Sequence, residues 1–124
     1  MEGFSEFEAE TFRLAKNLYA LRRQRDAIAG EKGLFGEPGW DILLDLYIAA
    51  RSGSETQVSS VCIEAGVPST TILRWIARLE KDGLVYRAAD TGDARRRYVR
   101  LTQAGHEMMD RVLRGILSVS SLAA

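Results

Sequence analysis

Apolar residues recur at helical spacing over much of this chain, and the pattern predicts long helices at both ends. The first helix is expected over residues 5–29, where Ser5 and Glu8 form a capping box and Phe4 stands at the position of a hydrophobic staple. Its apolar positions follow the helical spacing loosely and are Phe12, Ala15, Leu18, Tyr19 and Leu21. A helix of this length has more apolar surface than one small core can cover, so we expect part of it to contact a second subunit.

A glycine-rich connector leads to a second predicted helix. No Lys-Ser or Lys-Thr pair follows the glycines and no apolar strand precedes them, so the segment is interpreted as a loop rather than a phosphate-binding site. Pro38 marks the first turn of the helix, which is expected to run to about Arg51 and to be closed by residues 52–54. Residues 55–58 are predicted to form a short strand. The buried stripe of the helix is expected to consist of Trp40, Leu43, Leu44, Tyr47 and Ile48.

Residues 59–82 carry the pattern of a helix-turn-helix. A short helix to about residue 65 and a second helix over residues 69–82 flank a break at residues 66–68. The motif requires a small residue four positions before the turn glycine and apolar residues at four fixed positions around that glycine. Cys62 supplies the small residue. The four apolar positions are held by Ala65, Val67, Ile72 and Trp75.

The second helix of this motif has an apolar face and a polar face when its residues are placed about 100° apart. The apolar face carries Ile72, Trp75, Ile76 and Leu79, and the polar face carries Thr70, Arg74, Ala77 and Lys81. Arginine can bind guanine through two hydrogen bonds, threonine can contact several bases, and a small alanine allows close approach. This face therefore suits the major groove of DNA, and an ordinary solvated helix face is the alternative interpretation.

The first turn of this helix adds a candidate phosphate site. Ser69 is the expected N-cap, and the free backbone N–H groups of a first turn can bind a phosphate of DNA. The complete set of residues that we predict to contact DNA from this helix is Ser69, Thr70, Thr71, Arg74, Ala77, Arg78 and Lys81.

Two predicted strands, residues 84–87 and 95–101, flank a turn-rich stretch and form a hairpin over residues 84–101, the wing. Three consecutive arginines at its tip suit the phosphate backbone and the narrow minor groove. Asp93 lies two residues before Arg95 and is expected to hold that side chain by a charge-assisted hydrogen bond. The predicted DNA contacts of the wing are Asp93, Arg95, Arg96 and Arg97.

The net charge of the chain is zero, but its charges are unevenly distributed along the sequence. The 124 residues include 17 Lys and Arg and 17 Asp and Glu. Residues 68–100 hold 8 basic and 4 acidic residues, whereas residues 1–67 hold 7 and 11, and residues 101–124 hold 2 and 2. Positive charge concentrated in one segment can steer a polyanion towards a neutral protein. Neutrality therefore does not exclude DNA as a partner.

Length and composition limit the class of protein. With 124 residues, of which 46% are hydrophobic, the chain is expected to form one domain with a real core. One Cys and one His cannot form an internal disulfide or a conventional structural metal site, and a single thiol fits a reducing, cytoplasmic compartment. We expect no membrane span, because the apolar stretches are too short, and no signal peptide, because the acidic start has no basic region. No catalytic constellation is recognisable, so we expect neither an enzyme nor a cofactor.

Three short motifs resemble successive landmarks of MarR-type winged-helix regulators: residues 79–85 (LEKDGLV), residues 93–96 (DARR) and residues 101–105 (LTQAG). The resemblance covers roughly residues 40–120. It implies a mainly α fold with a small β-hairpin wing (α+β), a winged helix-turn-helix with long N- and C-terminal helices.

The resemblance also implies how such a protein works. The helix after Pro68 would enter the major groove, the wing with Asp93 and Arg95 would reach the adjacent minor groove, and Thr70 and Arg74 would take recognition roles. The terminal helices would join two subunits into a dimer on a near-palindromic site. A small-molecule effector is a further candidate partner.

The expected organisation is one winged-helix DNA-binding domain over residues 1–124, with an N-terminal helix (5–29), a core (38–101) and a C-terminal helix (102–120) that begins at Thr102 as its cap. Both terminal helices are expected to form the interface of a dimer. Because MarR-type proteins usually continue through a longer C-terminal arm, we expect the dimer interface to be reduced or rebuilt. The last helix offers a broad apolar stripe to the first helix: Met108, Met109, Val112, Leu113, Ile116 and Leu117.

Some side chains have a functional and a structural interpretation. Cys62 is either a redox sensor or a buried packing residue, and its place inside the motif favours packing. His106 and Asp110 lie one turn apart and could share a metal, but two ligands are too few for a site. Trp40 and Trp75 could line an effector pocket, although their helical stripes favour the core.

Three arginines near the end of the first helix are open to two interpretations as well. Arg22, Arg23 and Arg25 could contact flanking DNA, but a solvated helix end is favoured.

The sequence therefore predicts a dimeric, sequence-specific double-stranded DNA-binding regulator of transcription of the MarR type, bacterial by resemblance. The alternative is a winged helix that binds another protein without touching DNA. A protein-binding surface would more often be apolar or mixed, whereas this region concentrates basic residues. They are Arg74, Arg78, Lys81, Arg87, Arg95, Arg96, Arg97 and Arg100.

Overall fold

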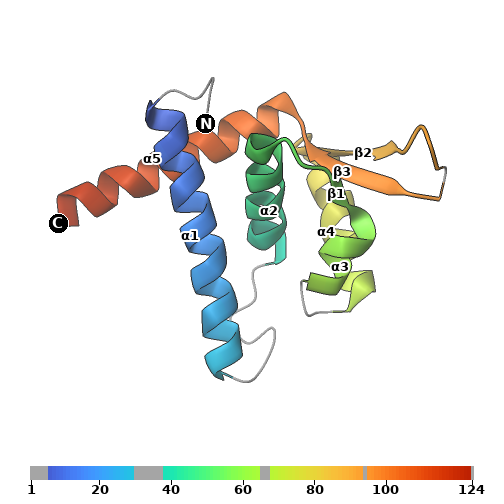
Figure 1. Ribbon diagram of the computed structural model, residues 1–124, viewed down its shortest axis with the longest axis horizontal. Helices are drawn as coiled ribbons and strands as arrows, with labels where there is room; N and C mark the ends of the chain where they lie inside the picture. The colour runs from blue at the N-terminus through green and yellow to red at the C-terminus, as the bar shows by residue number, and fades with distance from the viewer. Residues whose placement is uncertain (1–5, 30–37, 65–67, 94, 124) are drawn as a thin grey trace.

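The computed structural model describes residues 6–29, 38–64, 68–93 and 95–123, which form a group of helices with a small antiparallel sheet at one side (Figure 1). In chain order the elements are α1 (Glu6–Ala29), α2 (Pro38–Ser52), β1 (Thr56–Gln57), α3 (Val58–Glu64), α4 (Ser69–Lys81), β2 (Val85–Ala89), β3 (Arg97–Leu101) and α5 (Gln103–Ala123). This is the winged helix-turn-helix that the sequence predicts. Some predicted features lie outside the described residues, namely Phe4, Ser5, the glycine connector at residues 30–37, Ala65 and Val67.

Helix α2 lies at the centre of the core. Helices α1, α4 and α5 and strand β3 all pack against it. Of its predicted stripe, Leu43, Leu44 and Tyr47 are buried, while Trp40 and Ile48 are half-buried. Ile42 and Leu46 are buried as well. Burial extends beyond one stripe because elements pack on more than one side of α2, which a one-sided pattern does not predict.

The long helices α1 and α5 pack against each other at the end of the molecule opposite the wing (Figure 1). Met109 and Leu113 of α5 are fully buried in the core, and Ile116 packs on it in part. The expected pairing of the C-terminal apolar stripe with the first helix is therefore present within one chain. No helix in the described ranges is long and apolar enough to cross a membrane.

The wing, with strands β2 and β3, belongs to a three-stranded antiparallel sheet with the strand order β1-β3-β2. In the hairpin, Val85 pairs with Leu101, and on the other side of β3, Thr56 pairs with Val99. The predicted strand at residues 55–58 is present but shorter. Its pairing with β3 adds a third strand to the predicted hairpin.

The turn after α4 leads directly into the wing. Gly83 has a φ of +76°, a conformation that glycine adopts without strain. The N–H groups of Gly83 and Leu84 donate to the carbonyls of Glu80 and Leu79, each at 2.9 Å. These two bonds are the Schellman pattern that ends many helices.

Thr102 connects this turn to α5. Its hydroxyl donates to the carbonyl of Gly83 at 2.6 Å and accepts from the N–H of Gly105 at 3.0 Å, so Thr102 caps α5 as predicted. Its N–H donates to the carbonyl of Leu84 at 3.0 Å. A Cβ atom at residue 105 would overlap that same carbonyl oxygen, so the close approach of α5 to the turn requires glycine there.

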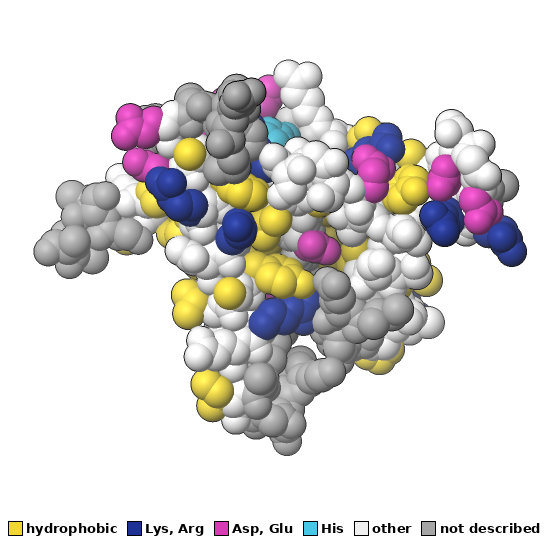
Figure 2. Space-filling model, viewed as in Figure 1, with side chains coloured by type: hydrophobic (Ala, Val, Ile, Leu, Met, Phe, Trp, Pro, Cys, Tyr) yellow, Lys and Arg dark blue, Asp and Glu magenta, His cyan; other side chains and the backbone are white. Residues whose placement is uncertain are grey.

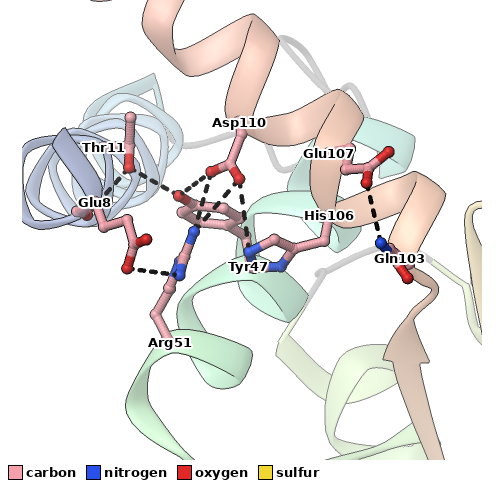
Figure 3. A network of polar contacts seen from close by, with 8 residues as sticks. All are labelled: Glu8, Thr11, Tyr47, Arg51, Gln103, His106, Glu107 and Asp110. Carbon is pink, nitrogen blue, oxygen red and sulfur yellow. Dashed lines mark hydrogen bonds and ion pairs between the residues drawn. The ribbon is translucent and has the colours of Figure 1, made fainter. Parts of the chain in front are cut away.

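A polar cluster joins α1, α2 and α5 beside the core (Figure 3). The hydroxyl of the fully buried Tyr47 donates to Oδ1 of Asp110 at 2.7 Å and lies 2.8 Å from the Thr11 hydroxyl. The guanidinium of Arg51 reaches the carboxylates of Asp110 and Glu8 at 3.2 and 3.3 Å. Each helix therefore contributes a charged or hydroxyl group to one connected set.

His106 completes the polar cluster from α5 (Figure 3). Its ring stacks on that of Tyr47 with the centroids 5.1 Å apart, and its Nε2 lies 3.8 Å from Asp110. Burial lowers the pKa of His106 and the charge of Arg51 lowers it further, while the carboxylates of Asp110, Glu8 and Glu107 act in the opposite direction. Desolvation prevails, so the folded protein favours the neutral imidazole.

We expect Gly105→Ala to lower the free energy of unfolding by about 1–3 kcal/mol, because the methyl group forces α5 away from the Leu84 carbonyl. Gly115→Ala in the same helix is the matched control. Nothing lies within 4 Å of its Cβ position, so it should raise the free energy by about 0.5–1 kcal/mol. Urea unfolding followed by tryptophan fluorescence measures both. Equal stability of the two variants would contradict the close contact at Gly105.

We expect the protein to lose stability as the pH falls through about 6.5, the ordinary pKa of histidine. Because the pKa of His106 is lower in the folded state, the unfolded chain binds the proton first and acid favours unfolding. His106→Gln removes this contribution, so its free energy of unfolding should change less between pH 8 and about 5.5. Urea titrations across this range test the expectation. Identical pH profiles for the two proteins would contradict it.

Candidate nucleic-acid interface

Helix α4 presents the two faces that the sequence predicts. Ile72, Ile76 and Leu79 are buried against the core. On the other side, Thr71 is half-buried, and the rest of the predicted set is exposed: Ser69, Thr70, Arg74, Ala77, Arg78 and Lys81. Within the described part of the chain, Arg74 and Lys81 form no ion pair. Their charges therefore face solvent without a neutralising carboxylate.

The predicted N-cap at Ser69 is wrong by one residue. Pro68 holds the N-cap position with φ −56° and ψ 140°, no side chain caps the helix, and Ser69 is its first residue. The carbonyl of Pro68 accepts from the N–H groups of Thr71 and Ile72 at 3.0 and 3.3 Å. Proline suits this position because its fixed φ matches the entry to a helix and its missing N–H is not needed there.

Trp75 and Arg78 lie at one edge of the exposed face of α4. The guanidinium of Arg78 lies 5.1 Å from the centre of the Trp75 ring, a cation–π contact. Trp75 itself is half-buried against the core. This agrees with the interpretation of Trp75 as a core residue rather than as the lining of an effector pocket. A shallow cleft of about 180 Å³ is lined by Thr71, Arg74, Trp75 and Arg78. The stacking holds Arg78 beside α4, away from the line through Thr70 and Ala77.

The loop of the wing is stabilised by Asp90. Its carboxylate accepts from the N–H of Gly92 at 2.8 Å and from the hydroxyl of Tyr98 at 2.9 Å. The Gly92 hydrogen bond first and the Tyr98 bond second lower the pKa of Asp90, and the same carboxylate raises the pKa of Tyr98. The carboxylate therefore stays ionised and keeps the two strand ends together near the tip.

The tip itself is organised by Asp93. The carboxylate accepts from the backbone N–H of Arg95 at 3.0 Å and from its Nε at 3.2 Å, which is the contact that the sequence predicts. The Arg96 guanidinium lies 3.9 Å from the other oxygen, and the N–H of Arg96 donates to the Asp93 carbonyl at 3.0 Å. The sequence predicts that the second strand begins at Arg95. Because this turn includes Arg95 and Arg96, β3 begins at Arg97 instead. The Arg95 side chain remains 91% exposed.

Besides Arg95 and Arg96, which lie near Asp93, two further basic residues counted around the wing have acidic partners. Arg87 donates to Glu80 at 2.5 and 2.8 Å, and Arg100 donates to Glu55 at 2.6 and 2.9 Å. The hydrogen bond to Glu55 has the largest effect on the pKa of Arg100 and raises it. Their charges are locally neutralised, so the free positive charge is smaller than the sequence count suggests. At the wing end, Figure 2 shows basic and acidic side chains next to each other.

The sequence favours a solvated helix end for the arginines near the end of α1, but two of them contact other side chains. Arg22 forms an ion pair with Asp41 of α2, and both side chains are mostly buried. Arg23 lies over the ring of Tyr19 at 4.9 Å and donates to its hydroxyl at 3.1 Å. These contacts tie the side chains to the protein surface and leave little reach towards flanking DNA. The side chain of Arg25 lies outside the described residues.

The structural interpretations of the remaining candidates fit the fold. Cys62 and Trp40 both pack partly buried against the core. His106 and Asp110 belong to the polar cluster, and the described residues contain no group of three or more potential metal ligands.

Leu73 is an exposed residue of α4 that the sequence pattern does not assign to either face. Its side chain is 39% exposed, and it lies one helical turn from both Thr70 and Ala77. Placing α4 residues about 100° apart sets Leu73 at the edge of the polar face. The position of Leu73 on the helix can be derived from the sequence, but only the fold shows that its side chain is exposed.

No protein-family profile and no curated protein matches the sequence. Several solved structures do match the fold. A mutant of MepR from a multidrug resistant S. aureus clinical isolate is 24% identical, with a TM-score of 0.53 over 61% of this chain and 52% of that one. This chain therefore spans about half the length of that protein.

Two further structures match over most of both chains. The S. aureus MepR-DNA complex is 19% identical, with a TM-score of 0.58 over 89% of this chain and 86% of that one. A probable transcriptional regulator from Pseudomonas aeruginosa is 27% identical, with a TM-score of 0.52 over 90% and 79%. These similar proteins are regulators of transcription rather than enzymes. The chain therefore has the winged-helix fold of the MarR-type transcriptional regulators.

Proposed function

We propose that this chain is a sequence-specific regulator of transcription that binds double-stranded DNA. The observation that carries the proposal is the outer face of α4, where Arg74 and Lys81 stand exposed without a carboxylate partner among the described residues. Guanine edges and phosphates both attract such groups. The likeness to MepR, which has been solved in complex with DNA, supports the proposal.

In this proposal, α4 enters the major groove with Thr70, Arg74 and Ala77 towards the bases. The short side chains of Thr70 and Ala77 leave room for the helix to approach, and Arg74 has the reach to bind guanine through two hydrogen bonds. Arg78 is held against Trp75 on the flank of the helix, where a phosphate is the natural partner. Ser69, Thr71 and Lys81 complete the contacts along the same helix.

The wing supplies the second contact, at the minor groove. The Arg95 side chain is 91% exposed, and the backbone N–H of Arg95 donates to the Asp93 carboxylate, which fixes the backbone from which the side chain extends. A pre-organised arginine loses less freedom on entering the narrow groove, where the negative potential is strongest. Arg96 and Arg97 are exposed beside it and would contact phosphates.

Binding to a protein partner instead of DNA is the competing function. The exposed surface of α4 is cationic and carries a single exposed large apolar side chain among the described residues, Leu73, whereas protein interfaces usually centre on an aromatic or aliphatic cluster. This comparison favours DNA.

We also propose a homodimer formed through α1 and α5. Both helices expose apolar side chains that the single chain leaves uncovered: Leu21 and Ile28 on α1, and Val112 and Val119 on α5. A two-fold dimer would present two copies of α4 to successive half-sites of a palindrome. A small-molecule effector stays a prediction from the sequence resemblance.

We expect Arg95→Ala and Arg74→Ala to weaken DNA binding in different ways. Arg95→Ala should weaken binding to all duplexes and reduce the slope of log affinity against log salt by about one, because one phosphate-type contact is lost. Arg74→Ala should lose discrimination by about 1–3 kcal/mol at one base pair. Fluorescence anisotropy on mixed-sequence and selected duplexes, at several salt concentrations, measures both effects.

Arg111→Ala is the matched control for this pair, because it removes the same charge from an exposed position on α5. Its affinity and salt slope should equal those of the unaltered protein. Equal loss of discrimination in Arg95→Ala and Arg74→Ala would refute the division between wing and helix. Absence of binding by the unaltered protein at low salt would favour the protein-interaction function.

We expect the combined change Val112→Glu and Val119→Glu to convert the dimer into monomers, because each glutamate would bury a charge in the interface. Gln103→Glu adds the same charge at the start of α5 and should leave the dimer intact. Sedimentation velocity at tens of micromolar compares the three proteins. A monomeric unaltered protein at that concentration would overturn the dimer.

A further inference from the structure

An apolar strip runs along α4 beside its cationic residues. Leu73 is 39% exposed, whereas its neighbours Ile72 and Ile76 are fully buried. Among the described residues, Leu73 belongs neither to the core nor to the apolar side chains that pack on it. Its side chain therefore lies outside the core that the described residues form.

The neighbours of Leu73 on the helix surface extend the apolar character. Thr70 precedes it by one turn and contributes a methyl group, and Ala77 follows it by one turn. All three residues are exposed. A single exposed leucine needs no explanation, but three methyl-bearing side chains in line form a continuous strip.

The strip lies next to the proposed base-reading cation. Arg74 is one turn from both Thr70 and Ala77, on the side of the helix away from Leu73. The major groove offers one apolar group, the 5-methyl of thymine, beside the hydrogen-bonding edges of the bases. A helix that carries a methyl strip next to an arginine is therefore complementary to a thymine next to a guanine.

We propose that Leu73, flanked by Ala77 and Thr70, is the residue that reads a thymine methyl group in the DNA half-site that Arg74 also contacts. This inference rests on the proposed DNA-binding function and deepens it, because it assigns a base identity to a residue with no hydrogen-bonding group. Burial of one methyl group against Leu73 corresponds to about a fourfold gain in affinity for thymine over the same base without its methyl.

The experiment replaces thymine by deoxyuridine, which pairs identically and lacks only the methyl group. A preferred duplex is first selected from a randomised library with the unaltered protein, and each thymine is then replaced singly. At one position in the half-site, the replacement should lower the affinity about fourfold at constant salt. Leu73→Ala should bind the thymine duplex about fourfold more weakly and should show no further loss with deoxyuridine.

Two variants separate this effect from general damage. Leu73→Met keeps an apolar side chain of similar volume and should retain the sensitivity to the methyl group. Arg74→Ala should lose discrimination at guanine and still respond to deoxyuridine. Unchanged affinity of Leu73→Ala for mixed-sequence DNA, with an unchanged salt slope, would show that the fold and the phosphate contacts are intact.

The outcomes distinguish the inference from the function on which it rests. If no duplex is enriched by selection, the proposed function fails and the inference fails with it. If a duplex is enriched but every thymine tolerates deoxyuridine, the inference alone is wrong. Persistence of the deoxyuridine effect in Leu73→Ala would assign the methyl to another residue and would also overturn it.

Discussion

Burial of α2 on several sides is the constraint on which the rest of this structure depends. Its central residue, Tyr47, places a large ring in the core and a hydroxyl at the boundary between three helices. A buried hydroxyl without partners would be costly, and here Asp110 and Thr11 supply them from α5 and α1. The position of each terminal helix is thereby tied to the same side chain. The packing that forms the core also determines how the long helices are oriented.

Charge in this protein is organised by local pairing rather than by totals. Carboxylates from α4 and from the residue before β1 neutralise Arg87 and Arg100, two of the three arginines on β2 and β3. Asp93 acts differently, because it orients Arg95 while leaving the guanidinium in solvent. On α4, the outer face carries cations without such partners among the described residues. The cations that remain exposed to solvent therefore lie in two regions, the outer face of α4 and the tip of the wing.

Much of the fold could be predicted from short-range patterns in the sequence. The two-sided pattern of α4 and the capping residue Thr102 both depend on neighbours within about two turns. The pattern misplaces the N-cap of α4 because serine is usually the better cap, whereas here Pro68 already supplies the turn. It misplaces the start of β3 because the turn at Asp93 extends over Arg96.

The remaining features depend on contacts between distant parts of the chain. The pairs Arg22 with Asp41 and Arg100 with Glu55 join separate elements, so no local pattern reveals them. The exposure of Leu73 also depends on what packs against α4. The candidate site was therefore predictable in its residue types and general location. Its electrostatic detail and its apolar strip required the three-dimensional arrangement.

The short strand β1 has a mechanical consequence. It is followed without any linker by α3, while its hydrogen bonds attach it to β3 in the wing. The chain from β1 through the two helices and the hairpin therefore returns to its own starting point and closes a loop. In such a closed loop, the backbone hydrogen bonds between β1 and β3 limit the distance between α3 and the wing. We therefore expect the two surfaces that face DNA in our proposal to keep a constant separation.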